Sequence, residues 1–109
     1  MFVMSDALAL TVFRAVADPT RRGILDLLSE GERPVRALVE RFAISQPALS
    51  KHLRILREAG LVGVEKVGRE RRYRLHAGGL RAVADWVLHY ERFWTDKLDR
   101  LGTYLDTDG

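Results

Sequence analysis

The sequence predicts a mainly α-helical domain of about five helices that also carries one small β-hairpin. Over most of the 109 residues, apolar side chains recur at steps of three and four, which is the spacing of a buried helix face. Between residues 62 and 75 the spacing changes to alternation, which is typical of strands. A chain of this length with 47% hydrophobic residues can form one modest core, so we expect a single domain spanning residues 1–109.

Two helices are expected near the N-terminus, separated by residues that end one helix and begin the next. The first runs from about Ser5 to Ala17. Asp18 can then cap a helix N-terminus, Pro19 suits the first helical position, and Gly31 favours the end of the second helix. The apolar residues of these two helices are Leu8, Val12, Phe13 and Val16, then Ile24, Leu25, Leu27 and Leu28.

A helix-turn-helix is expected over residues 34–59. Its two helices are joined by a link of three residues, 43–45, which is about the length of the turn inside this motif. Ser45, at the end of the link, is a suitable N-cap for the second of the two helices, which we expect to run from about Gln46 to Ala59. Gly60 offers a left-handed C-cap after it.

The helix that begins at Gln46 has one apolar and one polar side. Six residues fall within one arc of the helix, namely Ala48, Leu49, His52, Leu53, Ile55 and Leu56. Six fill the remainder, namely Gln46, Pro47, Ser50, Lys51, Arg54 and Arg57. Amide, hydroxyl and cationic groups near a helix N-terminus can read base edges in a major groove and contact the flanking phosphates, although ordinary solvent exposure would also explain each residue singly. His52 is expected to pack or to orient a neighbour, with a contact at the edge of DNA as the alternative.

A basic hairpin is expected over residues 61–76. Val62 and Val64 alternate on one arm and Tyr73 and Leu75 on the other, with a turn at Gly68. Four arginines lie at or just past the tip, namely Arg69, Arg71, Arg72 and Arg74. Three helices with a short turn, followed by such a hairpin, form the plan of a winged helix-turn-helix, in which the hairpin, or wing, approaches the minor groove or the DNA backbone.

A long final helix is expected over residues 79–105. Its apolar residues lie at steps of three and four, and they are Leu80, Val83, Val87, Tyr90, Trp94, Leu98, Leu101 and Leu105.

The net charge of +3 is distributed unevenly. Residues 1–32 carry −2, residues 33–81 carry +8, and residues 82–109 carry −3. A basic block between acidic ends is expected of a surface that meets a polyanion, although a solvated charged face would show the same composition. The cations are fifteen arginines and three lysines, and the guanidinium group suits phosphate recognition.

Three segments agree in order and spacing with one known family: "ADPTRRGILDLL" (residues 17–28), "SQPALSKHLRILREAGLV" (45–62) and "GRERRYRL" (68–75). They resemble the ArsR family of bacterial winged helix-turn-helix repressors, and the resemblance covers about residues 8 to 105. It implies a homodimer, built mainly from the first and last helices, that binds an imperfect inverted repeat in double-stranded operator DNA and represses transcription until a signal releases it.

The resemblance also implies site residues. The recognition-helix contacts to DNA would be Gln46, Ser50 and Lys51, and the wing contacts Arg69 and Arg71. The predicted DNA-binding set is completed by Ser45, Arg54 and Arg72. The predicted dimer interface consists of side chains from the first and last helices, namely Leu8, Val12, Val83, Trp86, Val87, Tyr90, Phe93, Trp94, Leu98 and Leu101.

No metal or other cofactor is expected. The chain has no cysteine, so the Cys-x-Cys pair of the family's arsenic and cadmium sensors is missing from "RPVRALVERF" (residues 33–42). The family's zinc and nickel sensors use an Asp-x-His pair and a later His-x-x-His or His-x-x-Glu, whereas this chain offers Asp85, His89 and the distant His76. Two ligands four residues apart without a third are weak for zinc, and an ion pair or dimer contact explains them better.

The sequence therefore predicts a DNA-binding repressor that needs no metal and regulates its own operon, as some members of a metal-free branch with a similar ending do. Two alternatives stay open: a winged-helix module that binds an acidic protein, and a repressor released by a small apolar effector near Trp86, Tyr90, Phe93 and Trp94. These aromatic residues are otherwise expected in the core or the dimer interface. An enzyme is not expected, because the chain lacks cysteine and a glycine-rich phosphate loop, and its three histidines have no evident partner. The start "MFVMSDALAL" lacks a basic signal region, and we expect a cytoplasmic protein.

Overall fold

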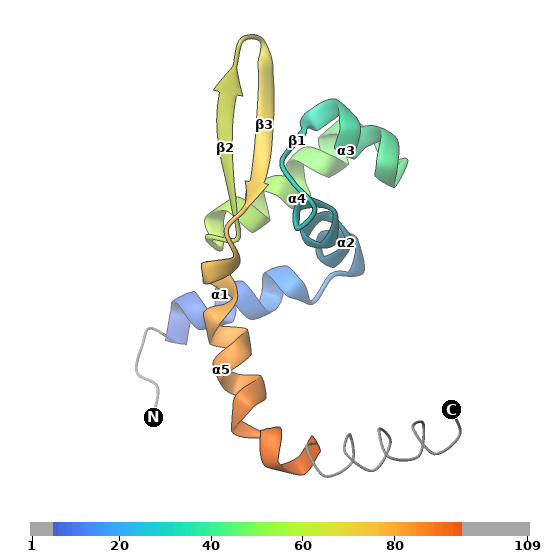
Figure 1. Cartoon of the computed structure of the whole chain (residues 1–109). Coiled ribbons are helices and arrows are strands. Elements are labelled where there is room, and N and C mark those ends of the chain that lie inside the picture. The colour runs from blue at the N-terminus through green and yellow to red at the C-terminus, as the bar shows by residue number, and fades with distance from the viewer. Residues whose placement is uncertain (1–5, 95–109) are drawn as a thin grey trace, which may run out of the picture.

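The computed structural model describes residues 6–94, and it shows a group of helices from which one small sheet projects (Figure 1). The elements in chain order are α1 (Asp6–Val16), α2 (Pro19–Leu28), β1 (Arg33–Pro34), α3 (Val35–Phe42), α4 (Gln46–Glu58), β2 (Val62–Val67), β3 (Glu70–Leu75), the 3-10 helix η1 (Ala77–Leu80) and α5 (Arg81–His89). The sheet is antiparallel with strand order β1-β3-β2. The predicted fold class, mainly helical with a hairpin wing, is confirmed.

The helix ends form through the capping residues that the sequence predicted. The Asp18 side chain accepts a hydrogen bond from the backbone N–H of Arg21 (3.0 Å) and begins α2 with Pro19 in its first turn. The Ser45 hydroxyl accepts one from the backbone N–H of Ala48 (3.2 Å) and begins α4. These caps fix where the second helix of each pair starts, and so which side chains of α4 face outward.

The wing is a tighter hairpin than predicted. β2 and β3 pair from Val62 with Leu75 to Val67 with Glu70, so only Gly68 and Arg69 lie in the turn. Gly68 adopts φ 64°, a left-handed conformation that suits glycine. The sequence predicts a turn over "VGRERR" (residues 67–72), but Val67 belongs to β2 and residues 70–72 to β3, because glycine in this conformation allows the chain to reverse within two residues.

Strand β1 was not predicted. Arg33 pairs with Tyr73 and Pro34 with Arg72, which adds a third strand to the wing. A strand of two residues is too short to show an alternating pattern in the sequence. Proline is tolerated in β1 because this strand forms the edge of the sheet, where an N–H group on the outer side has no neighbouring strand to bond with. This short strand attaches the wing to the segment before α3.

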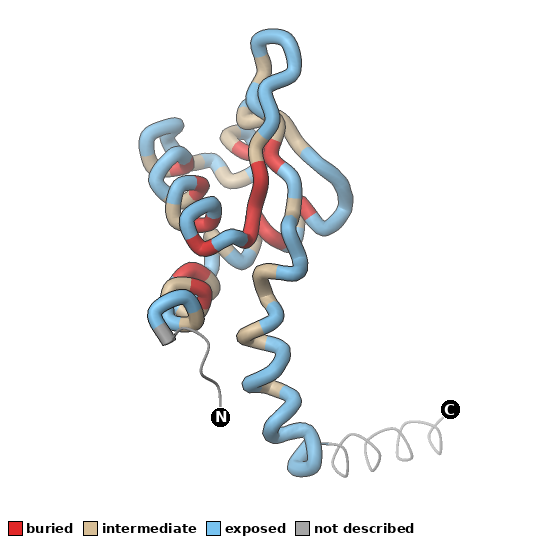
Figure 2. Tube along the Cα trace, turned by 90° about the vertical axis from the view of Figure 1, so that its left-hand side faces the viewer, coloured by how far each residue is buried: buried red, intermediate tan, exposed pale blue. Residues whose placement is uncertain are grey.

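The core lies between α1, α2, α4 and the base of the wing, as the buried segments in Figure 2 show. The apolar arc of α4 faces it: Leu49 and Leu56 are fully buried and Leu53 is 2% exposed. The remaining core residues are Val12, Ala15, Ile24, Leu25, Leu28, Leu38, Ala59, Leu61, Val62 and Tyr73. The interior therefore holds α4 by one side and leaves its polar side outward.

The long final helix expected over residues 79–105 is interrupted. The chain first forms η1, and α5 ends at His89 with a turn at Tyr90 (φ −101°, ψ 5°) before helical residues resume at 91–94. The apolar residues keep their spacing of three and four across this one-residue break, and no glycine or proline lies at it. The sequence pattern therefore did not reveal the break in the helix. The expected positions Leu98, Leu101 and Leu105 lie outside the described residues.

α5 extends downward from the base of the wing, mostly exposed, and crosses α1 (Figures 1 and 2). None of the helices within residues 6–94 is long and apolar enough to cross a membrane.

Candidate nucleic-acid interface

The outward side of α4 carries the side chains that the sequence singled out. Gln46, Ser50, Lys51 and Arg54 are all exposed, while their neighbours Leu49 and Leu53 are buried. Ser45 is also exposed, but its hydroxyl is engaged in capping α4. The four exposed residues offer an amide, a hydroxyl and two cations on one helix surface, starting at its N-terminus.

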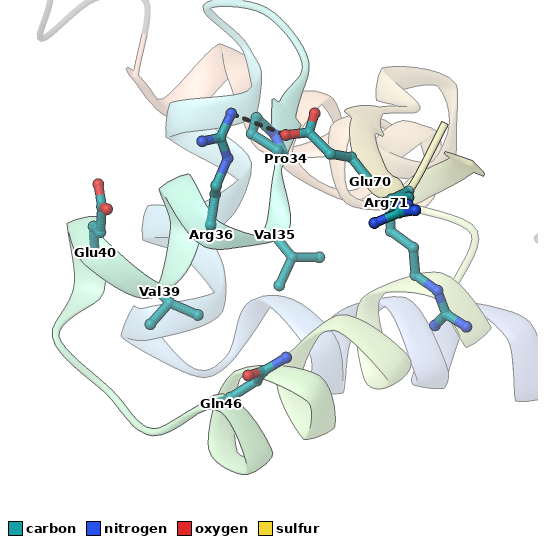
Figure 3. A pocket seen from close by; sticks show the side chains of 9 residues that line it. Pro34, Val35, Arg36, Val39, Glu40, Gln46, Glu70 and Arg71 are labelled. Carbon is teal, nitrogen blue, oxygen red and sulfur yellow. Dashed lines mark ion pairs between the residues drawn. The ribbon is translucent and has the colours of Figure 1, made fainter. Parts of the chain in front are cut away.

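A groove of about 560 Å³ lies between α3, the N-terminus of α4 and the tip of the wing (Figure 3). In Figure 3, Gln46 points from α4 into this space and Arg71 extends from β3 toward α4. The lining residues are Pro34, Val35, Arg36, Val39, Glu40, Gln46, Arg69, Glu70 and Arg71. The groove is therefore lined both by Gln46, whose amide is expected to read bases, and by the wing residues Arg69 and Arg71.

A second groove, of about 360 Å³, lies between the wing and the rest of α4. It is lined by Pro47, Ser50, Lys51, Arg54, Arg57, Arg71 and Tyr73. Arg71 borders both grooves, so the wing and α4 form one continuous, arginine-rich surface. The structure thus brings together Gln46, Ser50, Lys51, Arg54, Arg69 and Arg71 from the predicted DNA-binding set. A surface of this kind can contact base edges from the helix and phosphates from both elements.

Arg72 is placed differently from the other wing arginines. Its Nε donates to Glu32 (2.9 Å) and its Nη1 to Glu70 (3.3 Å), and the hydrogen bond to Glu32 raises the pKa of the Arg72 guanidinium. The second oxygen of Glu70 lies 2.9 Å from Nη2 of Arg36 on α3. Two carboxylates thus occupy Arg72, which makes it a weaker candidate for a phosphate contact than Arg69 or Arg71.

Sequence reasoning missed these carboxylates. Glu32 and Arg72 are forty positions apart, and Arg36 and Glu70 lie on different elements, so no local spacing links them. We name the four residues Glu32, Arg36, Glu70 and Arg72 the wing brace. They connect the wing to the start of α3 and so influence where the wing stands beside α4.

The faces of α1 and α5 present aromatic side chains to solvent. The Phe13 and Trp86 rings meet edge to face with centroids 5.7 Å apart, and Trp86 meets Tyr90 at 5.6 Å. Trp86 and Phe93 are more than half exposed. The other exposed or half-buried residues of the predicted interface are Leu8, Val83, Val87 and Trp94. A contiguous apolar surface of this kind is typical of an interface.

Val12 departs from the expected interface. Its side chain is only 2% exposed, so it packs within the protomer's own core and leaves little surface for a partner chain. It lies on the side of α1 that faces inward, whereas Leu8, one turn earlier, is half exposed.

Candidate metal ligands do not converge in the described range. Within residues 6–94 there is no group of three His, Cys, Asp or Glu side chains that could hold a metal ion. Asp85 instead lies 3.9 Å from Arg81 on the same helix.

Known proteins are similar to this chain in sequence and in fold. The family described as "Bacterial regulatory protein, arsR family" matches residues 18–64, which span α2 to the start of β2. The transcriptional repressor SdpR of Bacillus subtilis (strain 168) is 39% identical over 79 residues, covering 72% of this chain and 88% of SdpR. The HTH-type transcriptional regulator Rv2034 of Mycobacterium tuberculosis H37Rv is 36% identical over 97 residues, covering 89% and 88% of the two chains.

A solved structure agrees as well. The crystal structure of the ArsR family transcriptional regulator RHA00566 superposes with a TM-score of 0.76 at 30% identity, covering 86% of this chain and 97% of that one. These relatives are regulators of transcription and not enzymes. Together with the winged helix-turn-helix geometry, they show that this chain belongs to the ArsR family of bacterial transcriptional regulators.

Proposed function

We propose that the protein is a sequence-specific repressor that binds an inverted-repeat operator as a homodimer, needs no metal and acts on DNA in the cytoplasm. The observation that carries the proposal is the shared surface of α4 and the wing, where Gln46 borders the first groove, Ser50 borders the second, and Arg71 borders both. In this proposal the single domain has a DNA-binding part, formed by the helix-turn-helix and the wing, and a dimer-forming part.

Base reading is assigned to the first turns of α4. An amide can pair with adenine and a hydroxyl with several base edges, and both groups reach into a major groove from a helix that enters it by its N-terminus. Gln46 and Ser50 are exposed there, with Lys51 beside them. Discrimination between sequences therefore depends on these side chains.

Affinity is assigned mainly to the arginines. Arg54, Arg69 and Arg71 are exposed and border the grooves, where they can neutralise phosphates and release counterions. Such binding weakens steeply as salt rises, with a slope that reports the number of phosphate contacts. The basic middle of the chain, at +8 over residues 33–81, supports this assignment.

Dimerisation is assigned to the aromatic surface formed by α1, α5 and residues 90–94. A two-fold dimer would hold two α4 helices about one DNA turn apart, roughly 34 Å, so that both enter successive major grooves on one side of the duplex. The operator would then be an inverted repeat, as protein symmetry requires. The exposed rings of Trp86, Tyr90 and Phe93 supply the apolar contact such an interface needs.

Metal independence is supported by the residues themselves. Similar proteins include the arsenical resistance operon repressor of Escherichia coli (strain K12), 47% identical over 73 residues. This chain has no cysteine with which to bind arsenic through sulfur. A signal other than a thiolate-bound metal must release this repressor, if one does.

The test is a binding titration at several salt concentrations against the DNA upstream of the protein's own gene and against a scrambled duplex of equal length, with and without EDTA or zinc. Selective binding that neither EDTA nor zinc changes is expected, and it would establish a metal-independent autorepressor. Equal weak binding to both duplexes would contradict autoregulation. Equal binding to every duplex in a random-sequence library would also contradict sequence-specific recognition and favour a protein partner for the basic surface.

A further inference from the structure

Arg21, in the first turn of α2, joins the end of α1 to the middle of α4. Its Nε donates to the carbonyl oxygen of Ala15 (2.8 Å) and its Nη2 to that of Arg14 (3.1 Å), both near the C-terminus of α1. Its Nη1 lies 3.2 Å from Nδ1 of His52 on α4. One guanidinium thus contacts both the helix assigned to dimerisation and the helix assigned to DNA reading.

The chemistry of the two groups fixes the direction of this hydrogen bond. A guanidinium has only N–H donors, so this hydrogen bond requires the His52 tautomer in which Nδ1 carries no proton and accepts. Asp18 steadies the same turn, because its Oδ2 accepts the backbone N–H of Arg21 (3.0 Å) and lies 4.0 Å from His52 Nδ1. The His52 side chain is 21% exposed, and partial shielding from water strengthens a hydrogen bond to a charged donor.

The contact adds a directional constraint to α4. The buried side chains Leu49, Leu53 and Leu56 hold α4 on the core, but apolar burial is non-directional. A hydrogen bond prefers a narrow range of distance and angle, so the one to His52 limits rotation and sliding of the helix. His52 follows Lys51 directly, so any such movement would carry the outward residues with it.

We propose that Arg21 and His52 are positioning residues that make the placement of α4 depend on the placement of α1. The inference rests on the proposed function, since the spacing of two α4 helices matters only in a dimer on an inverted repeat. A dimer recognises the distance between half-sites through the distance between its recognition helices. The Arg21–His52 contact therefore sharpens discrimination between operator spacings and contributes little to affinity for DNA in general.

The experiment uses the full chain and an inverted repeat that the wild-type protein recovers from a random-sequence duplex library. Binding is measured to this repeat and to versions with one base pair added or removed between the half-sites. In His52→Leu the acceptor is lost, whereas in His52→Asn the amide oxygen can occupy the place of Nδ1 and accept instead. Arg21→Lys keeps the charge but lacks the planar fork that reaches three acceptors.

Arg22→Lys is the matched control. Arg22 is adjacent to Arg21 and donates to the carbonyl oxygen of Val16 (2.8 Å) at the same end of α1, but within residues 6–94 no hydrogen bond joins it to α4. Arg22→Lys therefore shows the effect of losing a hydrogen bond to the end of α1 while the Arg21–His52 contact to α4 is kept. Circular dichroism and sedimentation establish that every variant used is folded and dimeric.

We expect His52→Leu and Arg21→Lys to lose about tenfold of the preference for the selected spacing, and His52→Asn and Arg22→Lys to retain most of it. If both former variants keep the wild-type preference, the inference is overturned. An equal loss in His52→Asn and His52→Leu would overturn the role of the acceptor atom. If the wild-type protein itself recovers no inverted repeat or is monomeric, the proposed function fails first, and that result is visible without any variant.

Discussion

The carboxylate of Glu70 on β3 lies 2.9 Å from the guanidinium of Arg36 on α3, which ties the wing to the first helix of the helix-turn-helix. The other oxygen of Glu70 contacts Arg72, and Arg72 contacts Glu32. Exposed ion pairs contribute at most about 1 kcal/mol each to folding. The main effect of the wing brace is therefore on the orientation of the wing, and it also keeps two cations from acting as free phosphate ligands.

Glu70→Gln is expected to separate specificity from affinity. Removing this charge frees Arg36 and Arg72 to contact phosphates, so binding to a scrambled duplex should strengthen by a few fold, while the preference for the selected duplex should fall as the wing loosens. Glu65→Gln is the control, because Glu65 lies in the same hairpin and pairs only at 3.7 Å with Arg74. Anisotropy titrations with both duplexes give the two affinities, and identical behaviour of the two variants would contradict the role of the wing brace.

Trp86→Ala is expected to weaken the dimer. The Trp86 ring is 53% exposed in the protomer and lies between the rings of Phe13 and Tyr90, so a partner chain would bury it. A buried aromatic anchor contributes about 2 kcal/mol or more to an interface, which corresponds to about thirtyfold in the dissociation constant. Sedimentation equilibrium measures this constant. Val67→Ala, which alters a half-exposed valine on the wing, should leave it unchanged, and an unaltered dimer in Trp86→Ala would place the interface elsewhere.

Gly79→Ala and Gly78→Ala should differ although the two glycines are adjacent. A Cβ at Gly79 would collide with the carbonyl oxygen of Gly60, whereas one at Gly78 meets nothing within 4 Å. Overpacking of this kind costs about 1–3 kcal/mol, while alanine at an open site is neutral or slightly stabilising. Urea unfolding of both variants measures the difference. Equal stability would mean that η1 and the segment that follows α4 can move apart without cost.

Acid should weaken the α1–α2 junction through Asp18. The backbone N–H of Arg21 lowers the pKa of this carboxyl in the folded chain. A lowered folded-state pKa means that the stabilisation is complete above the unfolded value, about 3.9, and is lost as pH falls through the folded value. Asp18→Asn keeps a capping oxygen, so the stability difference between it and wild type should shrink below about pH 4. A difference that does not change between pH 7 and pH 3 would contradict the assignment.

Local chemistry made most of the helical fold predictable from the sequence. Asp18 and Ser45 cap helices through backbone partners three residues away, and Gly60 follows α4 in a left-handed conformation (φ 77°). Short-range sequence spacing was therefore enough to predict where these helices begin and end. The outward residues of α4 followed from the same helical period. The close approach of α4 and the wing could only be inferred from the general plan of a winged helix-turn-helix, because it depends on contacts far apart in the chain.

Features that depend on tertiary contacts were not predicted. β1 exists because Arg33 and Pro34 meet β3, and the brace carboxylate Glu32 lies in a loop whose sequence gives no sign of its partner. Val12 was assigned to the interface because the helical spacing shows which side of α1 is apolar but not which apolar residues the protomer itself buries. The break at Tyr90 likewise has no local signal.

The central claim is that the exposed face of α4 reads bases while the wing holds phosphates, and the ratio of affinities for the selected and scrambled duplexes in Gln46→Ala tests it most directly. Arg71→Ala is the matched comparison. It should weaken binding to both duplexes alike and lower the slope of log affinity against log salt concentration by about one. For Gln46→Ala we predict that affinity for the selected duplex falls by about 1–3 kcal/mol while affinity for the scrambled duplex stays near wild type. Equal losses on the two duplexes would contradict base reading by this helix.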